Sequence, residues 1–372
     1  MNIRTRSAGG LSPRWRFPLL AAALLSMAIG ALAGLARAGV PVPLVRPTHV
    51  ELHAVLMFGG FFGTVISLER AVAHGRSWAY LAPVFAAVGA VVLWAGGPLH
   101  LAAWLQFAAG ILLVVESWRL HVRQPQLHSR ILVLGAACWP IATLVWMGAG
   151  VVEPAIGLWI DFLVLTIAGE RLELSRLMPP APRARVLFAW LVGACLASAL
   201  VATLSVPLSQ GMLGVSFAAL AVWLVRHDIA RRTARSSALT GFIGRSLLAG
   251  YFWLVIGGAL MAAIPLSEGP WIRDAAMHAV LLGFVMSMVL GHAPIIFPAV
   301  VRLKIPYHPV FYLPLVLLHG SLLLRILGDL AASAALRADG ALGNAIALAA
   351  FVAVTAGSAI RGALRSPASS RR

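Results

Sequence analysis

The chain alternates between apolar runs of about twenty residues and short polar gaps. A helix of about twenty apolar residues crosses the roughly 30 Å hydrocarbon core of a bilayer. Backbone groups in lipid must bond within their own segment, and the alternation of a barrel strand is absent, so each run is predicted to be a helix. The pattern predicts an all-α, polytopic membrane bundle of about twelve transmembrane helices, at roughly 17–36, 50–70, 78–97, 99–118, 131–150, 154–174, 186–205, 208–226, 242–264, 274–299, 309–328 and 341–360.

The composition agrees with this pattern. Hydrophobic residues make up 60% of the 372 residues and charged residues only 11%, whereas a soluble domain has about 25% charged residues. No polar stretch is long enough for a separate soluble domain. Residues 1–372 are therefore predicted to form a single transmembrane domain in contact with membrane lipid.

The formal net charge is +17, but the basic residues lie in the gaps between apolar runs, which argues against nucleic acid as a partner. With the N-terminus inside the cell, the outer gaps hold five of the 29 Lys and Arg residues and the inner gaps the other 24. The outer five are Arg37, Arg46, Arg273, Arg325 and Arg337. By the positive-inside rule this asymmetry predicts a multi-pass protein of the bacterial inner membrane with both termini in the cytoplasm.

Two histidines near the outer ends of predicted spans are the leading candidate ligands. His53 lies in the first turns of the span at 50–70, and His278 lies one turn into the span at 274–299. Both spans run inward, so the two side chains are predicted at the same depth. An ionisable group in a span indicates function, and histidine ligates haem iron and copper. His49, one turn before His53 on the same predicted helical face, stays open as the ligand in its place.

Two further histidines lie deeper. His292 follows His278 by fourteen residues, which at about 1.5 Å per residue puts it roughly 21 Å away along the span. It therefore cannot share a ligand set with His278. His319 lies near the middle of the span at 309–328. For both, a second metal or a proton path is weighed against structural hydrogen bonding.

Acidic residues within the spans add a second set of candidates. Asp161 lies well inside the sixth predicted span without a basic neighbour in the sequence, so it must be protonated or paired. With Glu116 it is a candidate for a proton or ion path. At the inner ends of two spans, ion pairs are predicted between sequence neighbours, namely Glu69 with Arg70 and Glu170 with Arg171.

The stretch HAVLMFGGFF, which begins at His53, resembles the second helix of haem–copper oxidase subunit I. The stretch AMHAVL at 276–281 resembles the tenth helix of that family. The resemblance implies that His53 and His278 are the two axial ligands of a low-spin haem. The copper ligands of that family are absent, because the sixth span has no His-Pro-Glu motif and the seventh no His-His pair. Ala276 stands where the high-spin haem ligand is expected, so oxygen reduction is not expected.

The run HAVLLGFVMSMVLGH, from His278 to His292, is also similar to NnrS-type proteins. These are twelve-span, haem- and copper-containing relatives of subunit I that are associated with nitric oxide and denitrification. The resemblance implies haem b, with copper as a further cofactor and a quinol or cytochrome as electron donor. It implies a role in electron transfer or in handling nitric oxide and nitrosative stress. Haem propionates in the oxidases point outward towards arginines, and Arg325, Arg46 and Arg273 are the matching candidates, since guanidinium groups pair with carboxylates.

Two other functions stay open. A twelve-span secondary transporter would show inverted repeats and helices broken near the midplane, and no clear repeat is found in the sequence. The remaining alternative is an assembly factor of a respiratory complex without a cofactor of its own. The sequence makes no prediction of oligomeric state.

Overall fold

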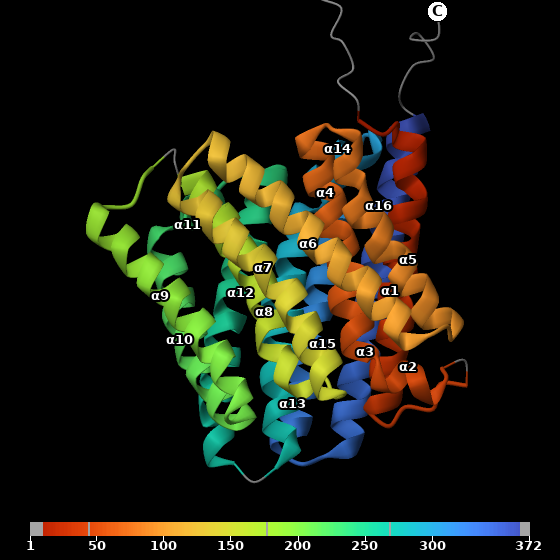
Figure 1. Cartoon of the computed structure of the whole chain (residues 1–372), viewed down its shortest axis with the longest axis vertical. Coiled ribbons are helices and arrows are strands. Elements are labelled where there is room, and N and C mark those ends of the chain that lie inside the picture. Colours follow the sequence, from red (N-terminus) through yellow and green to blue (C-terminus); the bar gives the residue numbers. More distant parts are fainter. Residues whose placement is uncertain (1–9, 44, 176–177, 268, 365–372) are drawn as a thin grey trace, which may run out of the picture.

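The computed structural model describes residues 10–43, 45–175, 178–267 and 269–364. Every regular element in these ranges is a helix. The described chain begins and ends at the same end of the bundle, which is at the top of Figure 1. We call this end the terminal end and the opposite one the far end. The all-helical architecture agrees with the prediction from the apolar runs.

Eleven helical segments within the described ranges are long and apolar enough to cross a membrane. Nine of them are built on one continuous α-helix each, and some carry a short 3₁₀ turn at one end. The nine helices are α1 (Pro13–Arg37), α5 (Leu81–Ala95), α6 (Leu99–Arg123), α7 (Leu127–Ala149), α9 (Pro182–Leu200), α10 (Val206–His227), α12 (Ala238–Ala263), α15 (Tyr312–Leu330) and α16 (Ala334–Leu364).

The other two apolar segments change helix type along their length. The first, His53–His74, consists of α3 (His53–Val55), the π-helix η1 (Leu56–Gly63) and α4 (Thr64–His74). The second, Trp271–Val301, contains most of α13 (Pro270–His278), then the π-helix η6 (Ala279–Met286) and α14 (Ser287–Val301). Two short helices at the ends of the bundle are α2 (Pro47–Glu51) and α11 (Ala230–Thr233).

The twelfth long helix is α8 (Glu153–Leu174), in the position of the sixth predicted span. It is 22 residues long and mostly buried, so it runs through the middle of the protein. Glu153, Asp161, Glu170, Arg171 and Glu173 make it more charged than the other eleven. The described residues thus form twelve long helices, of which eleven are apolar enough to span a membrane by composition.

The helix ends follow local rules. Pro13 and Pro182 begin α1 and α9, where a missing amide hydrogen costs nothing. Gly75 and Gly150 end α4 and α7 with φ values of 72°, which glycine adopts without strain. The core is aromatic around α8: Phe58 stacks on Trp159 with ring centroids 5.6 Å apart. This stacking contact joins η1 to α8.

Candidate functional site

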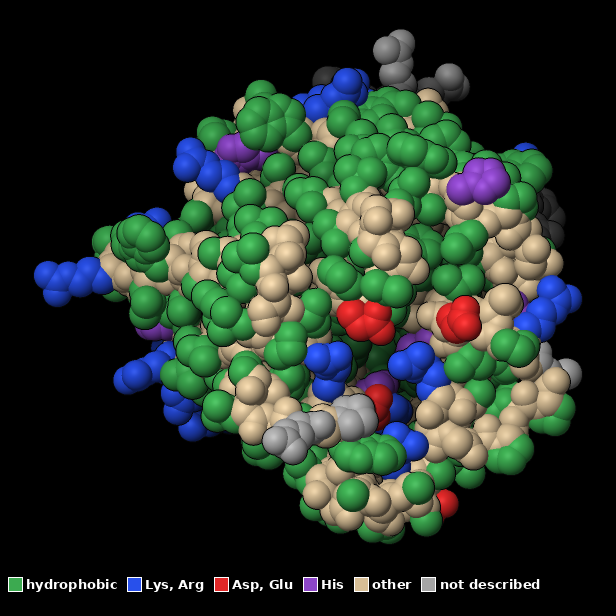
Figure 2. Space-filling model, turned by 60° about the horizontal axis from the view of Figure 1, so that its bottom comes forward, with side chains coloured by type: hydrophobic (Ala, Val, Ile, Leu, Met, Phe, Trp, Pro, Cys, Tyr) green, Lys and Arg blue, Asp and Glu red, His purple; other side chains and the backbone are tan. Residues whose placement is uncertain are grey.

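A cavity of about 620 Å³ is lined in part by residues of α3 and α13, two helices that lie towards the far end of the bundle (Figure 1). It is enclosed by residues from α1, the α3–η1 segment, α8, α13, η6, α15 and α16. Its volume is within the range of pockets that bind cofactors and other small molecules, about 300–1,000 Å³. Figure 2 looks towards the far end and shows a hollow with basic, acidic and histidine side chains at its rim. The cavity is therefore accessible from that end.

His53 is oriented by α1. Its Nδ1 lies 2.7 Å from the carbonyl oxygen of Gly30. A carbonyl only accepts hydrogen bonds, so Nδ1 carries the hydrogen and donates it. A neutral ring then has a free electron pair on Nε2. Gly34 makes room for the ring, because a Cβ at this position would lie 3.0 Å from Cε1 of His53.

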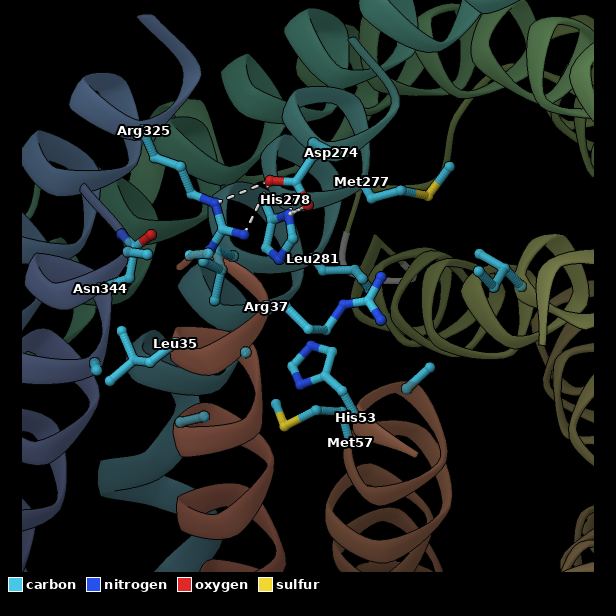
Figure 3. A pocket seen from close by; sticks show the side chains of 18 of the residues that line it. Leu35, Arg37, His53, Met57, Asp274, Met277, His278, Leu281, Arg325 and Asn344 are labelled. Atoms are coloured by element: carbon cyan, nitrogen blue, oxygen red, sulfur yellow. Dashed lines mark hydrogen bonds and ion pairs between the residues drawn. The ribbon is translucent and has the colours of Figure 1, made fainter. Parts of the chain in front are cut away.

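His278 is oriented in the same way within its own helix. Its Nδ1 donates to the carbonyl of Asp274 at 2.8 Å, and the Asp274 carboxylate lies 3.4 Å from the same nitrogen. Arg325, which is buried, pairs with the other carboxylate oxygen at 3.0 Å. In Figure 3 the rings of His278 and His53 point towards the space between them. Both Nε2 atoms are thus left without a hydrogen-bond partner among the described residues.

The two histidines share a local sequence and a local structure. Residues 53–56 and 278–281 both read HAVL, and a π-helix of eight residues follows each histidine within three positions. Short π-helical segments are frequently found at functional sites. The repeated tetrapeptide was the sequence signal that could have marked both positions as equivalent. The change of helix type could not be read from it.

Four arginines line the cavity: Arg37, Arg273, Arg325 and Arg337. Arg337 also stacks over Trp271, with its guanidinium carbon 4.2 Å from the ring centroid. Arg37 and Arg337 were counted among the outer arginines of the sequence but were not predicted to belong to the site. The carboxylates of Glu51, Glu153 and Asp274 line the same cavity, so positive and negative groups face each other across it.

The prediction that Arg46 belongs to this set is wrong. Arg46 is not among the residues that line the cavity. Its guanidinium donates to the carbonyl of Ala95, at 3.4 Å, and lies against Gly96. The reason is that Arg46 precedes the short helix α2, which carries it to the end of α5.

The prediction that His49 and His53 share one helical face is also wrong. His49 lies in α2, and Leu52, with φ −90° and ψ 10°, separates this helix from α3. The Nε2 of His49 lies 3.2 Å from the carbonyl of Trp94, away from the cavity lining. Because the helical repeat does not continue through Leu52, only His53 reaches the cavity.

His292 and His319 lie elsewhere. His292 lines a second, smaller cavity towards the terminal end, and its Nδ1 donates to the carbonyl of Met288 at 2.8 Å. Nδ1 of His319 accepts from the indole of Trp253 at 2.7 Å, and its Nε2 lies 3.4 Å from the Ser287 hydroxyl. Both ring nitrogens of His319 are therefore engaged. Within the described ranges no group of three or more His, Cys, Asp or Glu side chains is arranged to hold a metal ion.

The carboxylates within the spans are paired differently from the prediction. Arg70 pairs with Glu170 at 2.6 Å across α4 and α8, so the predicted pairs of sequence neighbours are wrong. The neighbours point to different sides of their helices, because adjacent residues are about 100° apart around a helix.

Asp161 and Glu116 are both completely buried, and no described residue bonds their carboxylate oxygens.

A family model described as a domain of unknown function (DUF8744) matches residues 16–360. The chain belongs to this family. No curated protein matches it. The match to the DUF8744 model runs from the first turns of α1 into the last turns of α16 and so includes both histidine-bearing segments and the whole cavity between them.

Proposed function

We propose that this DUF8744 chain is a b-type haem protein of the bacterial inner membrane, with His53 and His278 as the two axial ligands. One observation carries the proposal: both histidines line one cavity and bond through Nδ1 to a backbone carbonyl, which leaves Nε2 free. Metal-bound histidines usually have their other ring nitrogen bonded in this way. A haem held by two imidazoles needs no larger cluster of protein ligands.

The residues present fit a haem in other respects. Apolar side chains such as Met57, Phe58 and Leu281 line the cavity, as a macrocycle requires. The guanidinium groups of Arg37, Arg273 and Arg337 could pair with propionate carboxylates. Arg325 is the exception among the predicted partners, because Asp274 already accepts two of its hydrogen bonds.

A haem with imidazoles in both axial positions supplies one-electron transfer. His53 and His278 would both be engaged in holding the haem, so electron transfer is the function that these residues support best. We propose from the resemblance to NnrS and to haem–copper oxidase subunit I that this chemistry serves nitric oxide or nitrosative-stress handling, with a quinol or cytochrome as donor. We also propose, from the distribution of arginines, that the terminal end is cytoplasmic and that the cavity opens outward.

The test is a reduced-minus-oxidised absorption spectrum of the purified protein, together with its haem content per chain. The expected result is a b-type α band that is lost in both His53→Ala and His278→Ala. Two matched controls are His49→Ala, one turn earlier in the chain, and His292→Ala, on the same apolar segment as His278. Both should keep the band, because neither side chain lines the cavity.

The outcomes separate the parts of the proposal. A protein that is colourless even after expression with ample haem would contradict the haem itself. A band that survives both His53→Ala and His278→Ala would leave the haem but contradict these ligands. Metal analysis of the same sample measures whether copper accompanies the haem, as the resemblance implies.

A secondary transporter is the second candidate, and one observation favours it. Two apolar segments change helix type beside a cavity lined by four arginines, and interrupted helices beside a site for an anion are typical of transporters. This reading predicts a colourless protein that moves an organic anion into liposomes, with uptake abolished by Arg273→Gln.

A further inference from the structure

A second cavity, of about 100 Å³, lies towards the terminal end of the bundle between the η1–α4 segment, α8 and α14. A cavity needs roughly 10–15 Å³ of this kind of volume to hold one water molecule, so this cavity has room for a small polyatomic ion. Its walls are apolar apart from Glu69, Glu170, Arg171, His292 and the Thr166 hydroxyl. The side chain of Phe62 lines both cavities and stands between them.

The unexplained group in this cavity is Arg171. The residue is 6% exposed, yet its guanidinium forms no hydrogen bond and no ion pair with any residue that the structure describes. Buried charges in proteins are almost always paired, and unpaired ones within a membrane are rarer still. A counterion from outside the chain would complete the site.

The neighbouring carboxylates do not fill this role. Glu170 accepts from Arg70 at 2.6 Å, which neutralises it. Glu69 lines the same cavity but forms no ion pair with Arg171 among the described residues. The cavity thus contains one guanidinium that needs an anion and one carboxylate that can accept a hydrogen bond.

His292 adds a second acceptor. Its Nδ1 donates to the carbonyl of Met288, so Nε2 of the neutral ring offers an electron pair. His292 and Arg171 line the same cavity, so one small ligand can contact both groups. A matching ligand must present negative oxygen to Arg171 and an O–H group to His292 or Glu69. Hydrogen phosphate, bicarbonate and a singly protonated phosphate monoester have both, whereas sulfate has no hydrogen at neutral pH.

We propose that this cavity binds a small oxyanion that carries a hydrogen, with Arg171 as the counter-charge and with His292 and Glu69 as acceptors. The ligand chemistry is that of inorganic phosphate or of the monoester headgroup of phosphatidic acid. Basic pockets between helices bind anionic lipid headgroups in other membrane proteins. The site is separate from the proposed haem cavity and does not depend on haem.

Thermal unfolding of the purified full-length protein tests the proposal, because a ligand that binds the folded state raises the melting temperature. We expect sodium phosphate to raise the melting temperature in a saturable way, and sodium sulfate at equal ionic strength to have no such effect. Arg171→Gln should abolish the phosphate effect. The matched control is Arg231→Gln, an exposed arginine on α11, which should keep it.

Glu69→Gln gives an independent result if the Arg171 variant fails to fold. The amide has hydrogen-bond donors that the carboxylate lacks, so sulfate should now stabilise the protein almost as well as phosphate. A selectivity for phosphate over sulfate that is unchanged in Glu69→Gln would contradict the role of this carboxylate. Protein that responds to neither inorganic phosphate nor phosphatidic acid, or an equal response in Arg171→Gln, would overturn the proposal.

A second experiment, with lipid in place of inorganic phosphate, distinguishes a lipid headgroup from a free ion as the ligand. Delipidated protein is mixed with micelles that contain phosphatidic acid or, as the control, phosphatidylmethanol, an anionic phosphodiester whose headgroup has no O–H group to donate. A response to phosphatidic acid alone identifies a lipid headgroup, and a response to inorganic phosphate alone identifies a free ion. The haem spectrum is recorded in the same samples, so that failure of this site and failure of the haem proposal are distinguishable.

Discussion

His53 and His278 lie in spans that are more than two hundred residues apart, yet they leave the same ring nitrogen free beside one cavity. Each donates its Nδ1 hydrogen to a backbone carbonyl, that of Gly30 at 2.7 Å and that of Asp274 at 2.8 Å. The first bond comes from a neighbouring helix, whereas the second comes from one turn earlier in the same helix. The two rings therefore depend on different parts of the fold.

The dependence of His53 on α1 predicts the effect of Gly34→Ala. A methyl group at this position would lie 3.0 Å from Cε1 of His53, so the ring must turn away from its present position. We expect the haem content per chain to fall several-fold while the protein remains folded. Haem content and circular dichroism measure the two effects.

The control for this variant is Gly357→Ala in α16, where an added Cβ meets nothing within 4 Å. Alanine favours a helix over glycine by about 0.5–1 kcal/mol, so this variant should be slightly stabilised and keep its haem. Equal haem loss in both variants would mean that His53 is not held by α1 in the way described.

The dependence of His278 on Asp274 predicts a change in redox potential. Asp274→Asn removes a negative charge 3.4 Å from the imidazole and leaves Arg325 without its partner. The reduced, less positive iron is then favoured, so the midpoint potential should rise. We expect a rise on the order of tens of millivolts, since 59 mV is a tenfold change in a one-electron equilibrium.

Potentiometric titration of the haem band measures this shift. The backbone bond to His278 remains in Asp274→Asn, so the haem content should not change. Asp339→Asn, which removes an exposed carboxylate from α16, is the matched control and should leave the potential within a few millivolts of the wild-type value. A fall in potential on removal of Asp274 would contradict the proximity of this carboxylate to the iron ligand.

Buried Asp161 and buried Asp228 should respond differently to replacement by leucine. No described residue bonds the Asp161 carboxylate oxygens, whereas Asp228 accepts from the Tyr251 hydroxyl at 2.7 Å and from the Ala230 amide at 2.7 Å. Loss of a bonded partner in the interior costs about 1–3 kcal/mol. Asp228→Leu should therefore lower the stability by about this amount, and Asp161→Leu should leave it unchanged or raise it.

Thermal unfolding in detergent measures both changes. Equal destabilisation by the two substitutions would mean that Asp161 has a partner, such as a bound cation. If Asp161→Leu is stable but loses the proposed electron-transfer activity, the carboxyl belongs to the proton or ion path that the sequence suggested. That result would assign it a functional role with no contribution to stability.

The ion pair between Arg70 and Glu170 predicts a coupling between α4 and α8. Both side chains are partly exposed, at 16% and 33%, so solvent screens the pair. A double-mutant cycle with Arg70→Gln and Glu170→Gln should give a coupling of about 0.5–1 kcal/mol. The same cycle with Glu69→Gln should give a much smaller value. A larger coupling of Arg70 to Glu69 than to Glu170 would support the predicted ion pair between the sequence neighbours.

The sequence predicted the long helices well, because the length of an apolar run is a local property. It also predicted equal depths for His53 and His278 from the direction of each span and the rise of a helix, and both side chains line one cavity. The exclusion of His49 could not be predicted, because the break at Leu52 is a detail of backbone conformation. Two further features depend on packing between helices, which a single sequence does not reveal. One is the ion pair of Glu170 with Arg70. The other is the contact of His53 with Gly30 and Gly34.

Electron paramagnetic resonance of the oxidised protein tests the central claim most directly, because the ferric signal reports the axial ligands. The account predicts a low-spin signal in the wild-type protein and in the His49→Ala and His292→Ala variants. It predicts that His53→Ala and His278→Ala each lose that signal, through a change to high spin or through loss of the haem. An unchanged low-spin signal in either of these two variants would contradict the assignment of His53 and His278 as the ligands.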